Sequence, residues 1–194
     1  FGEPAEKLRG SKPVHAAKGY YDGVDAFISF HPAYMLPYFN TVRWDTHCGA
    51  GYGKIYEFYC DEPDGWMASE QASPIPASHA SARAPGAVDA VCLMHTACKY
   101  VKDNLVDATV PLSMNEFIMC AGQATADNLP AHVGMIQYFI RSPAREFNDR
   151  IIEVLDRNAE NVANMTQCKW RGHWVSKSRE GLPNHALSDL TWRN

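Results

Sequence analysis

The chain has 194 residues, of which 46% are hydrophobic and 21% charged, with a net charge of −4. That length suffices for one sizeable domain, or for a domain together with part of another. The weakly acidic net charge argues against nucleic acid or an anionic membrane as a partner. No run of the sequence approaches the roughly 20 apolar residues of a membrane span. No secretion signal opens the sequence.

The first residues predict a short helix followed by a buried strand. Ser11 is a good N-cap residue and Gly19 supplies a C-terminal stop, so residues 14–18 are expected to be helical. The run 24–30 is mostly apolar on both faces, which is typical of a buried parallel strand.

Glu6 precedes this helix, and His31 follows this strand. Parallel strands deliver their loops to the same carboxyl edge of a sheet, so the two side chains would emerge side by side if Phe1 ends an earlier strand. A carboxylate beside an imidazole is what a metal-assisted hydrolytic site needs. The alternative is a loop glutamate and a strand-end histidine with no shared function, and spacing alone favours that alternative.

A new segment begins after a linker at 32–40 that is rich in proline and aromatic residues. Residues 53–60 predict a strand, and residues 61–85 form a long polar stretch with four prolines. A loop of this length inside a compact domain is usually functional or mobile. His79 lies in it among small residues, free to reach a ligand, although a solvent-exposed histidine is the more common case.

The rest of the chain alternates between helices and strands. Strands are expected at 113–121, 132–141 and 168–176. One helix is expected at 87–104 and a second from Pro143 to about Met165. Ser142 is the expected N-cap of the second helix. Residues 181–194 are expected to form a loop and a frayed tail. Side chains alternate along 132–141, so Arg141 points to one defined face at the strand's end.

From residue 53 onward the predicted order is therefore strand, helix, strand, strand, helix, strand. This is the order of the split-βαβ, ferredoxin-like sandwich, in which two helices cover one face of an antiparallel sheet. The sequence thus predicts an α+β fold whose other sheet face, or an edge, remains available to another chain or domain.

The six cysteines are scattered along the chain and include no C-x-x-C pair. A cysteine zinc site is therefore not expected. In a chain of this length they are expected to pack as reduced thiols, which favours the cytoplasm.

Three motifs, in order, resemble those of a known family. Pro-Ala-Glu-Lys at 4–7, with Asp25-Ala26 and Phe30-His31-Pro32, resembles the central motif of the dinuclear-zinc aminoacylase and carboxypeptidase family. Its most similar branch contains aminobenzoyl-glutamate hydrolase and the indole-acetyl-amino-acid hydrolases. Ser78-His79-Ala80, with the run 85–90, resembles the second family motif, and Asp127-Asn128-Leu129-Pro130 with Arg141 resembles the third.

The resemblance implies a domain organisation. In that family an α/β zinc-hydrolase domain is interrupted by a ferredoxin-like lid or dimerisation domain. Residues 1–44 then correspond to part of the catalytic domain (strand, loop, helix, strand), 45–179 to the lid, and 180–194 to the return toward the catalytic domain. On this interpretation the catalytic domain is incomplete in the chain, which alone is expected to be inactive.

The resemblance also implies roles for five residues. Glu6 matches the general base, His31 a metal ligand, and His79 the lid histidine that reaches the reacting carbonyl. Asn128 and Arg141 match lid residues that hold the polar end and the carboxylate of the substrate. The implied activity is hydrolysis of N-acyl-amino-acid or peptide-like amide bonds, with zinc or manganese as the metal and a homodimer formed through the lid.

One departure from the family pattern concerns the metal site. The family shows Glu-Glu where this chain has Glu6-Lys7, and the second glutamate is a metal ligand. A lysine ammonium cannot take that place, so the ligand would come from elsewhere, with Glu3 as the nearest candidate, or the metal centre differs. Two other hypotheses stay open: a non-catalytic dimerisation or lid module, and a generic ferredoxin-like binding domain.

Overall fold

The computed structural model describes residues 10–28, 42, 44, 48–60, 85–104, 107–123 and 131–194. The chain splits into two compact units: unit 1 comprises Phe1–Cys48 and Glu180–Asn194, and unit 2 comprises Gly49–Arg179. The elements, in chain order, are α1 (Lys12–Ala17), β1 (Ala50–Tyr59), α2 (Ala87–Asn104), β2 (Ser113–Cys120), β3 (Val133–Ser142), α3 (Arg145–Thr166), β4 (Lys169–Ser178) and α4 (His185–Arg193). None of the described helices is long and apolar enough to cross a membrane.

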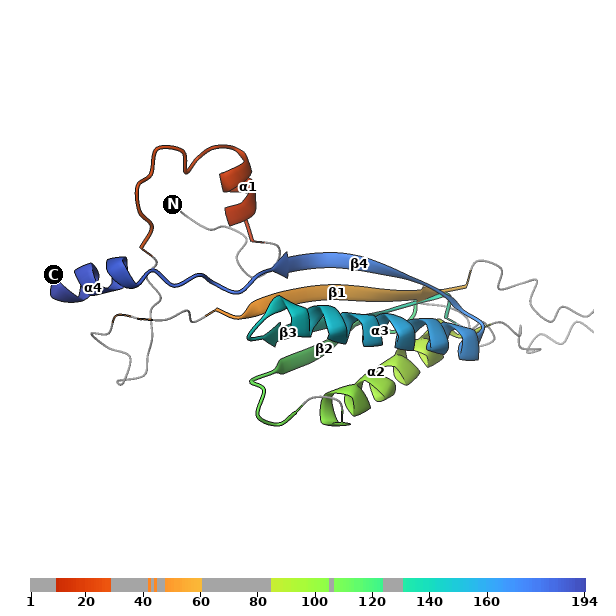
Figure 1. Cartoon of the computed structure of the whole chain (residues 1–194). Coiled ribbons are helices and arrows are strands. Elements are labelled where there is room, and N and C mark those ends of the chain that lie inside the picture. Colours follow the sequence, from red (N-terminus) through yellow and green to blue (C-terminus); the bar gives the residue numbers. More distant parts are fainter. Residues whose placement is uncertain are drawn as a thin grey trace, which may run out of the picture. The chain divides into compact units, whose positions relative to one another are not determined.

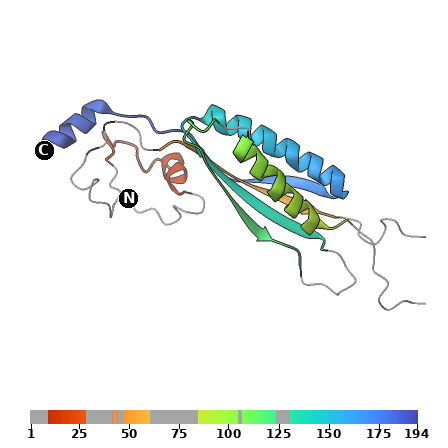
Figure 2. The ribbon, with the colours of Figure 1, turned by 90° about the horizontal axis from the view of Figure 1, so that it is seen from below.

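Unit 2 is a four-stranded sheet with the strand order β2-β3-β1-β4. Every neighbouring pair is antiparallel. Helices α2 and α3 lie side by side on one face of this sheet (Figures 1 and 2). The predicted α+β split-βαβ fold is therefore confirmed for unit 2, and the four predicted strands from residue 53 onward correspond to β1–β4 within three residues at each end.

The core of unit 2 lies between the sheet and the two helices. Tyr52, Tyr56 and Phe58 of the central strand β1 are fully buried on this side, as are Tyr138 of β3 and Met94 of α2. The hydroxyl group of Tyr138 donates to the Met94 carbonyl oxygen at 3.2 Å. Alternate positions of β1 and β3 thus supply the apolar layer that α2 and α3 cover.

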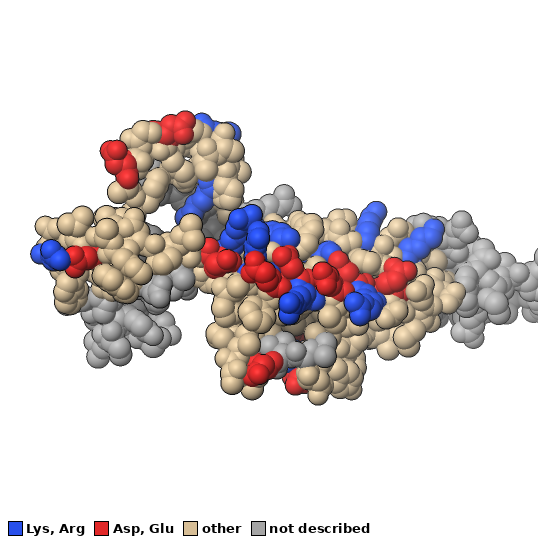
Figure 3. Space-filling view, viewed as in Figure 1, with Lys and Arg blue, Asp and Glu red and all other residues tan. Residues whose placement is uncertain are grey.

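Two similar polar clusters connect α3 to the sheet. The carboxylate of Asp156 accepts from Lys54 Nζ at 2.7 and 2.8 Å and from the Tyr56 hydroxyl at 2.7 Å. Asp149, two helical turns earlier, accepts from the Tyr52 hydroxyl at 2.9 Å and pairs with Lys177 at 3.1 Å. Figure 3 shows the acidic side chains gathered in a row over α3, with basic side chains on either side of it.

Three local predictions are wrong. No strand forms at 24–28, where Val24, Phe27 and Ile28 are exposed. A parallel strand needs a neighbouring strand to pair with, and the described part of unit 1 contains no strand. Ser142 does not cap α3 but ends β3, and its hydroxyl group donates to the Ala144 carbonyl at 2.7 Å. The helix instead begins at Arg145, and Ala144 is its N-cap.

The third error concerns the C-terminal residues, which form helix α4 rather than a frayed tail. The side chain of Asn184 caps this helix by accepting from the Leu187 N–H at 3.0 Å. Asp189 and Arg193 pair one turn apart at 2.5 Å. The Asn184 cap and the Asp189–Arg193 pair are helix signals that the sequence contains. The stretch is too short to show a full apolar stripe, so the helix was not predicted.

Candidate functional site

Among the five residues predicted to form a site, only Arg141 lies within the described part of the chain. Glu6, His31, His79 and Asn128 lie outside the described residues. Arg141 and the surface of unit 2 on which it lies are therefore the described part of the candidate site.

Arg141 lies on the face of the sheet that α2 and α3 do not cover, termed here the helix-free face. Its neighbours Ile140 and Ser142 are buried, and alternation along β3 turns the Arg141 side chain to the other side, where it is exposed. Its cross-strand partners are Gly51 on β1 and Ser113 on β2. Arg141 thus lies at the end of the sheet where β1 begins and β4 ends, and the prediction of one defined face is confirmed.

Two glycines of β1 determine what lies beneath Arg141. Phe139 precedes it on the same face, opposite Gly53 in the β1–β3 register. A Cβ atom at Gly53 would come within 3.1 Å of the Phe139 ring, and one at Gly51 within 3.7 Å. The aromatic ring therefore occupies the space that side chains at both positions would fill.

The Phe139 ring in turn supports the guanidinium group. Arg141 Cζ lies 5.2 Å from the ring centroid, which is within the range of a cation–π contact. This contact orients the guanidinium while leaving its N–H groups accessible. A planar fork of donors held in this way is suited to a carboxylate or another planar anion.

Hydroxyl groups from β4 adjoin the same two glycines. A Cβ atom added at Gly53 would lie 3.2 Å from Ser176 Oγ, and one added at Gly51 would lie 3.2 Å from Ser178 Oγ. Ser178 Oγ also donates to the Gly51 carbonyl oxygen at 3.2 Å. The sequence reasoning missed this group, although Gly51-Tyr52-Gly53 in a strand is itself a signal of close approach.

A second cluster on the helix-free face surrounds Glu57. Arg171 donates to both of its carboxylate oxygens, at 2.6 and 2.8 Å, and His173 Nε2 lies 2.7 Å from one of them. The hydrogen bonds from Arg171 are the main cause that lowers the pKa of Glu57 below its ordinary value, and His173 lowers it further. Burial of the carboxylate acts in the opposite direction. Because its carboxylate is already engaged by these donors, Glu57 is suited to tie β1 to β4 rather than to act as a base.

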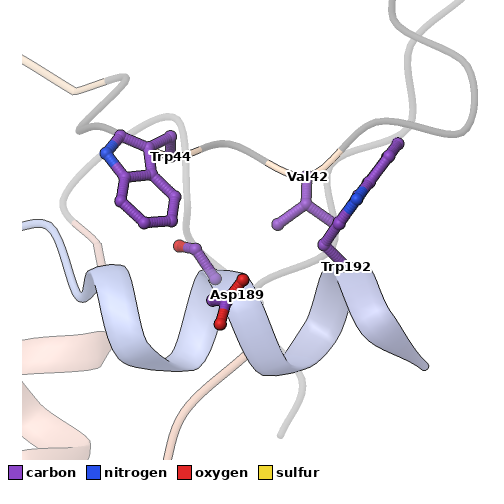
Figure 4. Close-up of a pocket in the computed structure, with 5 residues that line it drawn as sticks. Val42, Trp44, Asp189 and Trp192 are labelled. Carbon is purple, nitrogen blue, oxygen red and sulfur yellow. The ribbon is translucent and has the colours of Figure 1, made fainter.

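In unit 1 a hollow of about 270 Å³ is lined by Val42, Trp44, Ser188, Asp189 and Trp192 (Figure 4). The indole of Trp44 stacks on the His185 ring, with the centroids 4.6 Å apart. The carboxylate of Asp189 is paired with Arg193. The hollow therefore presents mainly apolar indole surface.

The described residues contain no group of three histidine, cysteine, aspartate or glutamate side chains able to hold a metal ion. The proposed ligand His31 lies outside them. The described residues thus include the candidate Arg141 and no metal centre.

Comparisons with known proteins agree on the fold. No family model matches the sequence, and no curated protein matches it. The aminobenzoyl-glutamate utilization protein from Klebsiella pneumoniae superposes with a TM-score of 0.60 at 15% identity, covering 96% of this chain and 42% of that one. The Bacillus subtilis YxeP protein, a dinuclear metal-binding peptidase of the M20 family, superposes with a TM-score of 0.56 at 13% identity, covering 99% and 43%.

The chain therefore spans less than half the length of these two structures. At such identities the likeness establishes the fold, and the resemblance seen in the sequence motifs is confirmed at that level. The chain therefore shares its fold with an aminobenzoyl-glutamate utilization protein and with a dinuclear metal-binding peptidase.

Proposed function

We propose that this chain is the lid-bearing segment of a metal-dependent amidohydrolase that cleaves N-acyl-amino-acid or peptide-like amide bonds. Two lines of support meet here. The fold is shared with an aminobenzoyl-glutamate utilization protein and a dinuclear metal-binding peptidase. Arg141, supported by Phe139, offers an exposed guanidinium group to a carboxylate, and an N-acyl amino acid carries a free carboxylate next to its amide bond.

The proposal assigns roles to the residues that the sequence motifs indicate. Glu6 would act as the general base, His31 as a metal ligand and His79 as a donor to the reacting carbonyl. Asn128 would hold the polar end of the substrate. A divalent metal, zinc with manganese as the alternative, would supply a water of lowered pKa. The cytoplasm is the proposed compartment.

Hydrolysis by the 194-residue chain, supplied with zinc or manganese, tests whether this segment, which is expected to be inactive alone, has activity of its own. Release of free amino acid from N-acyl amino acids, lost in Glu6→Gln and retained in the exposed control Glu146→Gln, would support it. If bound metal and turnover are both absent, the chain acts as a lid module without activity of its own.

Arg141→Ala is expected to raise KM for substrates with a free carboxylate by about 10- to 150-fold, since a hydrogen bond to a charged group contributes about 1.5–3 kcal/mol. The corresponding carboxamide substrates should be affected little. Arg141→Lys should recover only part of the loss, because an ammonium group lacks the planar fork.

The matched control for this prediction is Arg145→Ala, which removes an exposed arginine that pairs with Glu146 on α3. It should leave both substrates unaffected. An equal loss on the carboxylate and the carboxamide substrates in Arg141→Ala would contradict the assigned role. Where the chain lacks turnover, the same pair of ligands is compared by binding.

The second candidate function, a homodimerisation module, is favoured by the difference between the two edges of the sheet. The edge strand β2 exposes three consecutive apolar residues, Phe117, Ile118 and Met119, each by more than half. The opposite edge strand, β4, carries lysine, arginine and histidine side chains. Charged side chains discourage pairing of edge strands, so we propose that a second copy pairs along β2.

Phe117→Lys is expected to weaken self-association by at least about tenfold in the dissociation constant, or 1.4 kcal/mol. The introduced ammonium groups would be buried at the β2–β2 junction. Sedimentation over a range of concentrations measures the effect, and Phe147→Lys, at an exposed aromatic position on α3, is the control. A wild-type chain that is monomeric at every concentration would contradict the dimer.

A further inference from the structure

Two cysteines stand at matching ends of neighbouring strands. Cys60 directly follows β1, and Cys168 directly precedes β4. All six cysteines of the chain are free thiols in the structure, with Cys60 half-buried and Cys168 buried. The two residues are 108 positions apart in the sequence, so only the sheet brings them together.

The strand register places these cysteines opposite each other. Tyr59 pairs with Lys169 and Phe58 with Trp170 in the antiparallel β1–β4 ladder. Continuing this register by one residue places Cys60 directly across from Cys168. Alternation then turns both side chains to the side of the sheet that carries the buried Phe58.

The backbone hydrogen bonding of Cys60 shows whether Cys60 and Cys168 form a hydrogen-bonded or a non-hydrogen-bonded pair of the β1–β4 ladder. Its N–H donates to the His132 carbonyl oxygen at 3.0 Å, on the β3 side of β1. Its backbone groups therefore point away from β4, and the pair with Cys168 is of the non-hydrogen-bonded kind. Opposed residues of this kind have Cα atoms about 4.5 Å apart, which falls within the roughly 4.4–6.8 Å that a disulfide spans.

An electrostatic effect between the two residues agrees with this placement. Burial is the main cause that raises the pKa of the Cys168 thiol, and the neighbouring Cys60 raises it further. Of the other four cysteines, Cys48 is exposed and belongs to unit 1, and the remaining three have different surroundings. Cys92 and Cys98 lie on α2, and Cys120 faces Met135 across the β2–β3 ladder.

We propose that Cys60 and Cys168 are a disulfide-forming pair that is oxidised by low-molecular-weight disulfides of the glutathione type. The more accessible Cys60 thiolate attacks one sulfur of the oxidised glutathione and releases one glutathione thiolate. The Cys168 thiol then loses its proton to solvent, and its sulfur attacks the Cys60 sulfur and expels the second glutathione thiolate. Two protein thiols and one small disulfide thus give one protein disulfide and two glutathione thiols.

The test is oxidation of the native 194-residue chain with oxidised glutathione, followed by alkylation of the remaining thiols and non-reducing tryptic mapping. Cleavage after Lys54 and Arg83, and after Arg157 and Lys169, isolates each cysteine in its own peptide, 55–83 and 158–169. The expected product is a cross-linked pair of these peptides whose mass is two hydrogens below their sum. Its formation should raise the midpoint of thermal unfolding by roughly 5–10 °C, reversibly on reduction.

Two variants and a control make the outcome decisive. Cys168→Ser should stop the reaction at a glutathione adduct on Cys60, and Cys60→Ser should prevent the cross-link. Cys92→Ser, which removes an exposed thiol on α2, should leave the cross-link unchanged. A stable glutathione adduct on Cys60 in the wild-type chain, or a cross-link between other cysteines, would overturn the proposal.

Discussion

Asp156→Ala is expected to lower the free energy of unfolding of unit 2 by about 3 kcal/mol, the lower end of the range seen when one partner of a buried ion pair is removed, since the Asp156 side chain is itself 35% exposed. The side chain of Lys54 is only 9% exposed and donates to both oxygens of the Asp156 carboxylate. Without that carboxylate the buried ammonium group loses its ion-pair partner and keeps the rings of Tyr56 and Trp174, whose centroids lie 5.3 and 5.0 Å away. Urea unfolding followed by circular dichroism measures the loss.

The chain provides a matched control in Asp149→Ala. Asp149 makes the same kind of cluster with Tyr52 and Lys177, but its side chain is 46% exposed and that of Lys177 is 52% exposed. An ion pair in water contributes about 0–1 kcal/mol, so this variant should unfold at nearly the wild-type urea concentration. Similar losses in the two variants would mean that burial does not distinguish the clusters.

Gly134→Ala is expected to destabilise unit 2 by about 3 kcal/mol, the upper end of the usual cost of overpacking. A Cβ atom at this position on β3 would lie 2.7 Å from Val91 Cγ2 and 2.9 Å from the Ala87 carbonyl oxygen. Both atoms belong to α2, and the second is backbone, so the first turn of the helix would have to move away from the sheet. Thermal and urea unfolding measure the effect.

Gly51→Ala is the control for this variant, since it adds the same methyl group to a neighbouring strand of the sheet. There the nearest atoms are Ser178 Oγ at 3.2 Å and the Phe139 ring at 3.7 Å, both on side chains that can adjust. We expect a loss within about 1 kcal/mol. A loss at Gly51 as large as that at Gly134 would show that backbone proximity is not what decides the cost.

The order of elements in unit 2 could be predicted because its helices and strands carry clear periodicities. The apolar stripe of α3 and the alternation of β3 are local features, and the fold class followed from their order. The run 24–30 misled the prediction, because an apolar run indicates a strand only if neighbours exist to pair with it. That condition depends on the tertiary structure.

The candidate site shows the same division between local and long-range information. The face of Arg141 follows from alternation within one strand, and its orientation was predicted. The support from Phe139 and the cluster around Glu57 depend on which residue of one strand lies opposite which residue of another. Strand register is not contained in any single segment, so these contacts became visible only in the structure. The roles of Glu6, His31, His79 and Asn128 remain predictions.

The two clusters that join α3 to the sheet have a mechanical consequence. Asp149 and Asp156 are two helical turns apart, and each has its own tyrosine and lysine partners. Sliding α3 along the sheet by one turn, about 5.4 Å, would separate both carboxylates from their partners at once. The helix is therefore fixed in a single axial position, and unit 2 is expected to respond to ligands or partners without internal sliding of α3.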